Sequence, residues 1–212
     1  MNEKSKKAKK KGDLFIRLGL LLIAAALLLT AYNIFSAKMA GEKAEVALQT
    51  LKADIQTIEE ESVDIVTADN RPLYEQYPDM EMPLVEIDGE TYIGILSLPS
   101  LGVELPVKGD FSYKALLSAP CRYYGSVYLN NMIICAHNYN SHFGRLKNLQ
   151  GGDRVSFTDG DGNQFLYSVA EIVQVNGSDV DAMKNGEWDL TLFTCTLNGR
   201  ERVAVRLDKV EQ

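Results

Sequence analysis

The hydropathy pattern is dominated by a long apolar run near the start of the chain. From Leu14 to Phe35 the only charged residue is Arg17, and the run is long enough to cross a bilayer, which takes about 20 residues. Lysines crowd residues 1–13, and such basic clusters favour the cytoplasmic side. The pattern therefore predicts a basic cytoplasmic tail over residues 1–13 and a single transmembrane anchor over residues 14–36. A cleaved signal peptide is the alternative, but "FSAKMA" is a poor cleavage site.

A helical pattern follows the apolar run. Four apolar residues recur at spacings of three and four, which places them on one side of a helix: Leu48, Leu51, Ile55 and Ile58. We expect a helical stalk over residues 37–66, in which this side either forms a short coiled coil or packs against the protein's own domain. Residues 67–85 contain three prolines and are expected to form a linker or a wrapping segment.

From residue 86 onward, short runs of β-forming residues alternate with Gly, Asn and Asp turns. Eight stretches are strand candidates: residues 91–99, 103–107, 125–129, 132–137, 153–159, 163–175, 190–196 and 200–207. Residues 113–120 and 142–149 are expected to form short helices. Many short strands at close spacing are typical of a barrel or a sandwich, so residues 86–212 are predicted to form a mainly β domain.

Composition narrows the possible functions. The 212 residues carry a net charge of −7, although the first 36 residues are basic, so the main body is strongly acidic. A nucleic-acid binder needs a basic face, which argues against that class. The three cysteines, Cys121, Cys135 and Cys195, are too few for a disulfide-built fold. The acids of "DGDGNQ" alternate as in a calcium loop, but the glycine and glutamate of that loop are missing, so a hairpin turn is the simpler interpretation.

The stretch "LTLFTCTLNGRERVAVRL" predicts two strands joined at Asn198-Gly199, a strong signal for a two-residue turn. Such a turn pairs Cys195 with Arg202 and Leu197 with Arg200. Directly opposed residues share a face of the sheet. We therefore expect Thr191, Phe193 and Arg206 on the face of Cys195, and Leu192, Thr194, Val203 and Val205 on the core face.

Cys195 and Arg202 together suggest nucleophilic catalysis. A guanidinium favours the thiolate, which is the attacking form, and can donate to the oxyanion that an attack creates. His137 ends an apolar strand and is the candidate base, whereas His142, in the following loop, could be solvated or contact a substrate. A buried cysteine beside a surface arginine is the structural alternative. No third member of a triad is evident, and no Cys and His set has metal-ligand spacing.

At these residues the chain resembles the sortases, the cysteine transpeptidases of Gram-positive bacteria. Their TLxTC signature is matched by Thr191-Leu192-Phe193-Thr194-Cys195, their downstream arginine by Arg202, and their strand-end histidine by His137. "YIGILSLPSLGVELPV" is similar to the family's first two strands. The segment before "LTLFTC" is short for class B, and no Asp-Pro-aromatic lid indicates class C, so no class is assigned.

The resemblance implies a closed eight-stranded β-barrel and a reaction through a thioester on Cys195, with no cofactor. The substrate would be the Thr–Gly bond of an LPXTG-like sorting signal on a surface protein. The acceptor would be an amine of a cell-wall precursor or a pilin. His137 would move the protons and Arg202 would hold the oxyanion or position the substrate. A cysteine peptidase that releases a free acid and a non-catalytic, stalked surface protein are the alternatives.

Overall fold

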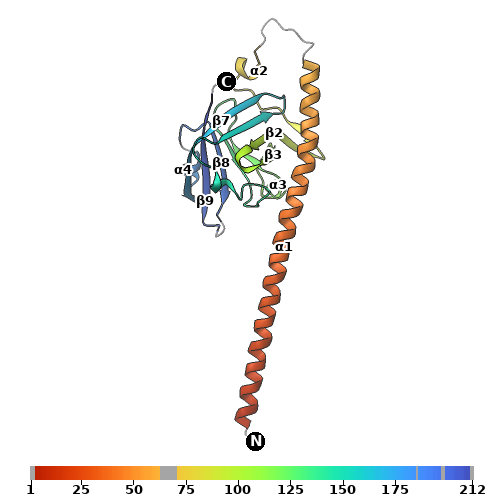
Figure 1. The fold of residues 1–212 in the computed structure, drawn as a ribbon, viewed down its shortest axis with the longest axis vertical. Coiled ribbons are helices and arrows are strands. Elements are labelled where there is room, and N and C mark those ends of the chain that lie inside the picture. Colours follow the sequence, from red (N-terminus) through yellow and green to blue (C-terminus); the bar gives the residue numbers. More distant parts are fainter. Residues whose placement is uncertain (1–2, 63–70, 185, 197–198, 211–212) are drawn as a thin grey trace. The chain divides into compact units, whose positions relative to one another are not determined.

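The computed structural model describes residues 3–62, 71–184, 186–196 and 199–210 (Figure 1). The helices are α1 (Glu3–Ser62), α2 (Leu73–Gln76), α3 (Tyr113–Leu116) and α4 (Val180–Lys184), with two 3₁₀ turns, η1 (Pro99–Leu101) and η2 (Leu146–Asn148). The strands are β1 (Val85–Ile87), β2 (Glu90–Leu98), β3 (Val103–Lys108), β4 (Cys121–Tyr124), β5 (Met132–Cys135), β6 (Arg154–Asp159), β7 (Gln164–Asn176), β8 (Leu190–Cys195) and β9 (Glu201–Lys209).

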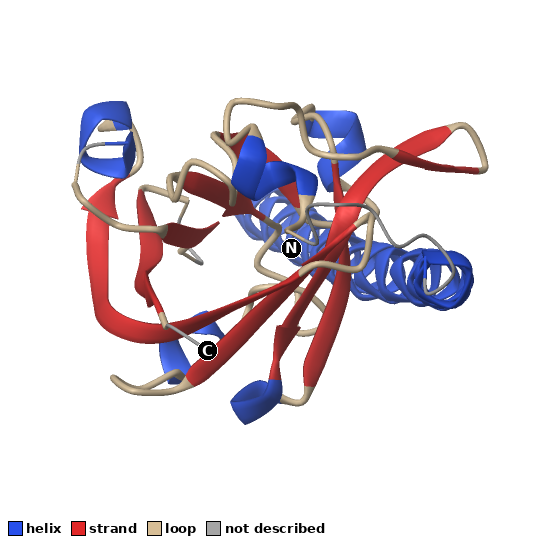
Figure 2. Ribbon diagram, turned by 90° about the horizontal axis from the view of Figure 1, so that it is seen from above, coloured by secondary structure: helices blue, strands red, loops and turns tan. Residues whose placement is uncertain are grey.

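Eight of these strands close into a barrel, as predicted. Their order is β2-β3-β4-β5-β8-β9-β7-β6, and the ring closes because β6 pairs with the second half of β2. The short β1 pairs with the first residues of β2 and extends the sheet beyond the ring. Figure 2 shows the strands curving around a common interior. Closure removes exposed strand edges and gives the barrel a rigid wall on which loops can be held.

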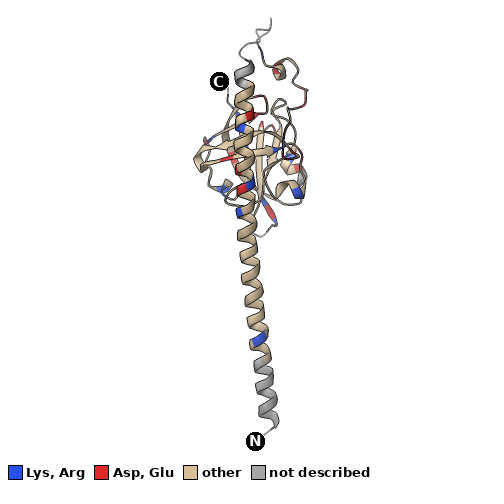
Figure 3. Cartoon of the chain, turned by 90° about the vertical axis from the view of Figure 1, so that its right-hand side faces the viewer, with Lys and Arg blue, Asp and Glu red and all other residues tan. Residues whose placement is uncertain are grey.

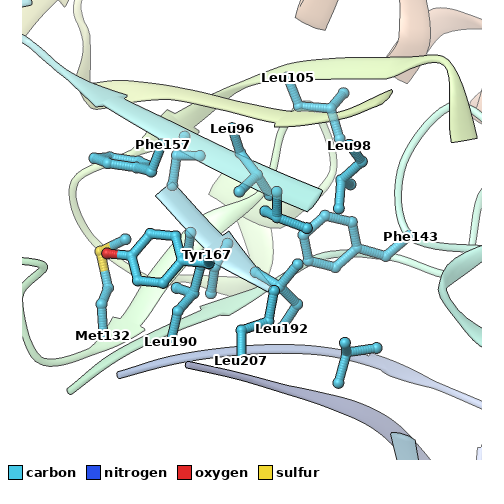
Figure 4. Close-up of a cluster of buried hydrophobic side chains, with 14 of the residues drawn as sticks. Leu96, Leu98, Leu105, Met132, Phe143, Phe157, Tyr167, Leu190, Leu192 and Leu207 are labelled. Carbon is cyan, nitrogen blue, oxygen red and sulfur yellow. The ribbon is translucent and has the colours of Figure 1, made fainter. Parts of the chain in front are cut away.

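The barrel interior is filled by apolar side chains from alternate positions of the strands. Leu192 on β8 and Val203 and Val205 on β9 all belong to the main core cluster, which confirms the predicted core face of this hairpin. Figure 4 shows Leu192 among other core side chains, including Tyr167 and Phe143. Phe143 comes from the loop after β5 and is fully buried, so the core itself anchors the loop that follows His137.

The first part of α1 is exposed and apolar. Side chains from Leu14 to Phe35 are almost all exposed, and no charged residue lies between Arg17 and Lys38 (Figure 3). This is the single helix in the described chain that is long and apolar enough to cross a membrane. Met1–Lys38 and Met39–Gln212 form two separate compact units.

The second part of α1 belongs to the same compact unit as the barrel. Its buried side chains follow helical spacing: Ala40, Ala44, Ala47, Leu48, Leu51 and Ile55. Leu51 and Ile55 share a cluster with Tyr92 and Ile95 of β2, and the Lys52 Nζ lies 2.6 Å from a Glu104 carboxylate oxygen on β3. Of the two arrangements that the sequence allowed, the structure has the helix packed on its own domain. The compact unit therefore begins at Met39 and is larger than the predicted 86–212.

The described part of the proline-rich segment, residues 71–85, wraps over the barrel. The ring of Tyr74 stacks on Tyr128, with centroids 5.0 Å apart and planes 9° apart, and Met82 is buried in the main core. Residues 63–70 of this predicted linker lie outside the described part of the chain.

Several local predictions differ from the structure. Residues 125–129, predicted as a strand, form a turn because Asn131 Oδ1 accepts a hydrogen bond from the Ser126 amide and Ser126 Oγ accepts one from the Tyr128 amide. The predicted helix over 142–149 is reduced to the turn η2. Strands β1 and β4 were not predicted. "DGDGNQ" is a hairpin turn, in which the Asp159 carboxylate accepts hydrogen bonds from the Asp161 and Asn163 amides.

Candidate active site

His137 and Cys195 leave neighbouring strands at the same end of the barrel. Strands β5 and β8 run parallel, with Cys135 paired with Phe193. The Ala136 amide donates to the Phe193 carbonyl at 3.2 Å, and the Thr194 hydroxyl donates to the Ala136 carbonyl at 2.8 Å. These bonds fix the chain on both sides of the strand ends, so His137 and Cys195 follow directly after bonded residues of adjacent strands although they lie far apart in the sequence.

Cys195 pairs with Arg202 across the β8–β9 hairpin, as predicted. The Thr196 amide donates to the Glu201 carbonyl at 2.9 Å, which extends the same register toward the turn. Gly199 has a φ of 70°, a conformation that favours glycine. Asn198, the predicted turn residue, lies outside the described residues. Leu197, the predicted partner of Arg200, lies outside them as well.

The Arg202 guanidinium is turned toward the backbone of the hairpin. Its Nη1 donates to the carbonyls of Gly199 at 3.2 Å and Glu201 at 3.1 Å. The same nitrogen lies close to Gly177, where an added Cβ would approach it to 2.8 Å. Strand pairing therefore places Arg202 beside Cys195, while its hydrogen bonds in this structure go to main-chain oxygens. Arg202 and Cys195 line the same pocket.

The other two cysteines have a different environment. Cys121 on β4 and Cys135 on β5 are paired across the strands, and both are buried free thiols. Burial raises the pKa of Cys121 to about 11 and also raises the pKa of Cys135, so both remain protonated at neutral pH. Cys195 is only partly buried and faces two pockets. It is the one thiol of the three with both access to solvent and a cation on the opposing strand.

The two histidines also differ. His137 is half-buried, and burial lowers its pKa, so its imidazole is neutral at neutral pH and can accept a proton. Its ring lies 5.0 Å from the Tyr139 ring. His142 is fully buried and lines neither pocket next to Cys195, so neither expectation for it, solvation or substrate contact, agrees with the structure.

Burial lowers the pKa of His142 to about 4, and the positive charge of His137 acts in the same direction. The nearby Ala40 carbonyl on α1 opposes this shift. Neither ring nitrogen has a hydrogen-bond partner in the described structure. His142 is therefore held as a neutral ring beneath the loop that follows His137.

That loop is built from tight turns. The Tyr139 carbonyl accepts hydrogen bonds from the amides of His142 at 2.9 Å and Gly144 at 2.8 Å, and the His137 carbonyl accepts one from Phe143 at 3.2 Å. A Cβ at Gly144 would lie 2.8 Å from the Tyr139 carbonyl, so only glycine fits at this position without moving the loop. The backbone after His137 is thus fixed by hydrogen bonds and by close packing.

Two pockets meet at Cys195. The first, which we call the aromatic pocket, measures about 290 Å³ and is walled by Phe111, Tyr113, Tyr123, Phe193, Met183 and Arg202, among others. Its rings form a continuous series from the strand of Cys195 outward. Phe193 contacts Tyr123 with centroids 5.3 Å apart, and Tyr123 contacts Phe111 at 5.4 Å. This surface suits apolar parts of a peptide.

The second pocket, which we call the polar pocket, measures about 600 Å³ and lies against the other face of the hairpin end. Its lining includes Thr194, Thr196, Glu201 and Val203 from the hairpin. Four amide side chains and two cations complete the polar part of the wall: Asn138, Asn140, Asn148, Gln174, Arg145 and Lys147. A peptide or a charged group can find hydrogen-bond partners here.

Arg206 holds one wall of the aromatic pocket in place. It is 4% exposed and lies opposite Thr191, whose hydroxyl accepts a hydrogen bond from the Arg206 Nη1 at 2.9 Å. The guanidinium also donates to the carbonyls of Ala182 and Met183 on α4. Met183 lines the aromatic pocket, so the hydrogen bonds from Arg206 hold this part of the pocket wall against β9.

Sequence reasoning brought together Cys195 and Arg202 and placed His137 correctly at a strand end. It missed the tether formed by Arg206, although the alternation of the hairpin had already placed that residue on the face of Cys195. It also missed Tyr123 and Phe111, because β4 was not predicted. The polar pocket gave no sequence signal, since its residues come from segments whose proximity depends on closure of the barrel.

The fold is a closed β-barrel that carries a thiol, an imidazole and a guanidinium near the ends of adjacent strands. The family model of the sortase domain matches residues 96–210, more than half of the chain, and the chain belongs to the sortase family, whose members are cysteine transpeptidases. Sortase A from Bacillus anthracis is 27% identical over 151 residues, which cover 68% of each chain.

Solved structures share the fold. A Clostridium perfringens sortase D5 transpeptidase superposes with a TM-score of 0.55 at 18% identity, covering 80% of this chain and 99% of its own. Sortase C1 from Streptococcus agalactiae superposes with a TM-score of 0.53 at 20% identity, covering 77% of this chain and 90% of its own. These neighbours belong to different sortase classes, and the similarity supports the barrel without assigning a class.

Proposed function

We propose that the protein is a membrane-anchored transpeptidase that cleaves an LPXTG-like sorting signal on surface proteins and transfers the acyl group to an amine. The observation that carries this proposal is the convergence of Cys195, His137 and Arg202 at the ends of three strands, where two pockets of different chemistry share the thiol. One pocket can hold the acyl donor while the other admits the acceptor, as a transfer reaction requires.

In the first half-reaction, the Cys195 sulfur attacks the carbonyl carbon of the threonine in the signal, and His137 takes the thiol proton. Arg202 rotates from the hairpin carbonyls and donates to the oxyanion, which preorganised donors stabilise strongly. The carbon–nitrogen bond then breaks, and the leaving amine takes the proton from His137. A thioester remains on Cys195, and the apolar residues of the signal lie in the aromatic pocket.

In the second half-reaction, the acceptor amine attacks the thioester carbon and gives its proton to His137. The carbon–sulfur bond breaks, and the thiolate that leaves recovers the proton from His137. The product is a new amide, which joins the surface protein to an amine of a cell-wall precursor or a pilin. If water attacked instead, the same residues would release a free acid, which is the peptidase alternative.

The apolar part of α1 is proposed to anchor the enzyme, with the lysine-rich tail in the cytoplasm and the barrel outside the cell. The support is the uncharged stretch between Arg17 and Lys38 next to the basic tail. Protease added to intact protoplasts should remove the barrel domain. Full protection of the domain would contradict this orientation.

The test of the proposed function uses the full chain in detergent with a panel of LPXTG-like peptides, with and without amine acceptors, followed by mass spectrometry. The proposal predicts cleavage after threonine and a product whose mass includes the amine. Release of only the free acid at every amine concentration would favour the peptidase. No cleavage of any peptide would favour the non-catalytic surface protein, an alternative that membership of the sortase family already weakens.

A further inference from the structure

We propose that the polar pocket is the acceptor site and that it selects an amine whose own residue carries a free carboxylate. This inference rests on the proposed function and names the class of its second substrate. The acceptors considered above are an amine of a cell-wall precursor and an amine of a pilin. Of these two, the inference favours a small cell-wall amine that carries an ionised carboxyl group. A lysine side chain within a folded protein has no such group nearby.

The geometry of the hairpin separates the two pockets. Residues opposed across β8 and β9 share a face, so Cys195 and Arg202 project to one side, toward the aromatic pocket. Thr196 and Glu201, one position further along, project to the other side and line the polar pocket. Cys195 itself reaches both pockets. An acyl group held on the Arg202 side therefore leaves the opposite side of the thioester open to the polar pocket.

The polar pocket offers charged and amide groups that the protein does not use. The side chains of Arg145 and Lys147 make no hydrogen bond or ion pair within the described structure, and neither do the side-chain amides of Asn138, Asn140, Asn148 and Gln174. In the aromatic pocket, by contrast, Arg202 already binds main-chain carbonyls. A row of donors without protein partners, next to the nucleophile, is suited to an oxygen-rich anionic ligand.

The polar pocket carries charges of both signs, which suits an amino acid better than a simple anion. Arg145 and Lys147 come from the segment after the His137 loop, whereas Glu201 comes from the start of β9, close to Cys195. A carboxylate on the acceptor would pair with the two cations, and guanidinium groups bind carboxylates with particular strength. The amino group would lie toward Glu201 and thus toward the thioester, and when it attacks as the neutral amine it gives one proton to His137.

The experiment compares acceptors that differ only in this carboxylate. The full chain in detergent is loaded with a sorting-signal peptide, and the thioester is then offered glycine or glycinamide, and separately lysine or lysinamide. The readout is the ratio of amide product to hydrolysed acid at equal concentrations of neutral amine. We expect the carboxylate forms to be preferred about five- to tenfold, since partly exposed ion pairs contribute modestly. The preference should shrink as salt is raised.

Variants that lack the positive charges of Arg145 and Lys147 test the role of these two residues. The double variant Arg145→Gln and Lys147→Gln should bring the preference close to one, and Arg145→Lys should retain part of it. Arg154→Gln, which removes an exposed cation on β6 that lines neither pocket, is the matched control and should keep the full preference.

The outcomes separate the two proposals. If no thioester forms, the proposed function fails. If the thioester forms and reacts equally with both members of each pair, or if the double variant keeps the preference, the acceptor site is assigned wrongly and the proposed function still stands.

Discussion

The two pockets beside Cys195 share one thiol but differ in how their walls are made. The aromatic pocket is walled by interlocking rings and by a helix tethered through the buried Arg206. The polar pocket is walled in part by a loop, whose Asn138, Arg145 and Lys147 side chains make no hydrogen bond or ion pair within the described residues. The first is thus preformed by packing, and the second is preformed by the backbone turns after His137 but keeps free donors. Strand alternation sends the residues next to Cys195 to opposite sides of the hairpin, so two pockets with different walls reach the same thiol.

The largest expected effect is the loss of the shared thiol. Cys195→Ala should abolish thioester formation, a loss of at least about 10⁴-fold, because no other group can form the covalent intermediate. Cys121→Ala and Cys135→Ala should retain most of the activity, since both thiols are buried and protonated. The measurement is acyl-enzyme formation by intact mass. A thiol reagent that inactivates the enzyme while labelling only Cys121 or Cys135 would overturn the assignment.

The second-largest effect is expected from changes to Arg202, which lines the aromatic pocket. Arg202→Ala should slow thioester formation about a hundred- to a thousandfold, the usual loss of an oxyanion donor. Arg202→Lys should recover only part of this, because an ammonium does not reproduce the planar guanidinium. Arg200→Ala is the control, since Arg200 is exposed and lines neither pocket. Equal damage from Arg200→Ala and Arg202→Ala would contradict the role given to Arg202.

A smaller effect is expected at the tether behind the aromatic pocket. Arg206→Met leaves the α4 carbonyls without their buried donor, and Met183 loses its fixed position. We expect the KM for the sorting peptide to rise about tenfold, because a lost hydrogen bond to a charged group costs about 1.5–3 kcal/mol. Thr191→Val removes one of these bonds and should have a milder effect. The ratio of transfer product to hydrolysed acid should stay unchanged while the KM for the sorting peptide rises. A change in that ratio with an unchanged KM would mean that Arg206 acts on the polar pocket instead.

The last effect is on stability instead of on activity, and it concerns the dependence of the His137 loop on pH. The His142 pKa is lowered by burial to about 4, below the value of about 6.5 in the unfolded chain. The unfolded chain therefore binds more protons between these values, and stability falls as the pH drops through this window. His142 should contribute a loss of about 2 kcal/mol between pH 7 and pH 5.

Urea unfolding, followed by the fluorescence of the single Trp188, measures this loss. His142→Phe keeps a buried ring without a titrating group, so its stability should depend less on pH. An unchanged pH dependence in this variant would show that His142 is not the responsible group.

The sequence predicted the parts of this account that depend on local chemistry. The pairing of Cys195 with Arg202 followed from the turn signal, and the core face followed from the alternation of Leu192, Val203 and Val205. The position of His137 followed from the end of an apolar strand. These features require only neighbouring residues in the chain, so a single sequence contains them.

The parts that the sequence did not predict depend on long-range closure. The packing of α1 through Leu51 and Ile55 was one of two open alternatives, because an apolar helix face does not identify its partner. The polar pocket combines residues of the His137 loop with Gln174 of β7 and Glu201 of β9. Strand β4 was not predicted, and therefore the series of aromatic rings that runs through its Tyr123 was not predicted either.

The central claim is that Cys195 joins a donor pocket to an acceptor pocket, and a two-step mass experiment on the full chain tests it most directly. The enzyme is first mixed with a sorting-signal peptide without amine, and the acylated peptide of the enzyme is located after digestion; a carboxylate-bearing amine is then added. We expect an acyl group on Cys195 that disappears as the amide product forms. An acyl group on another residue, or a Cys195 adduct that yields only free acid at every amine concentration, would contradict it.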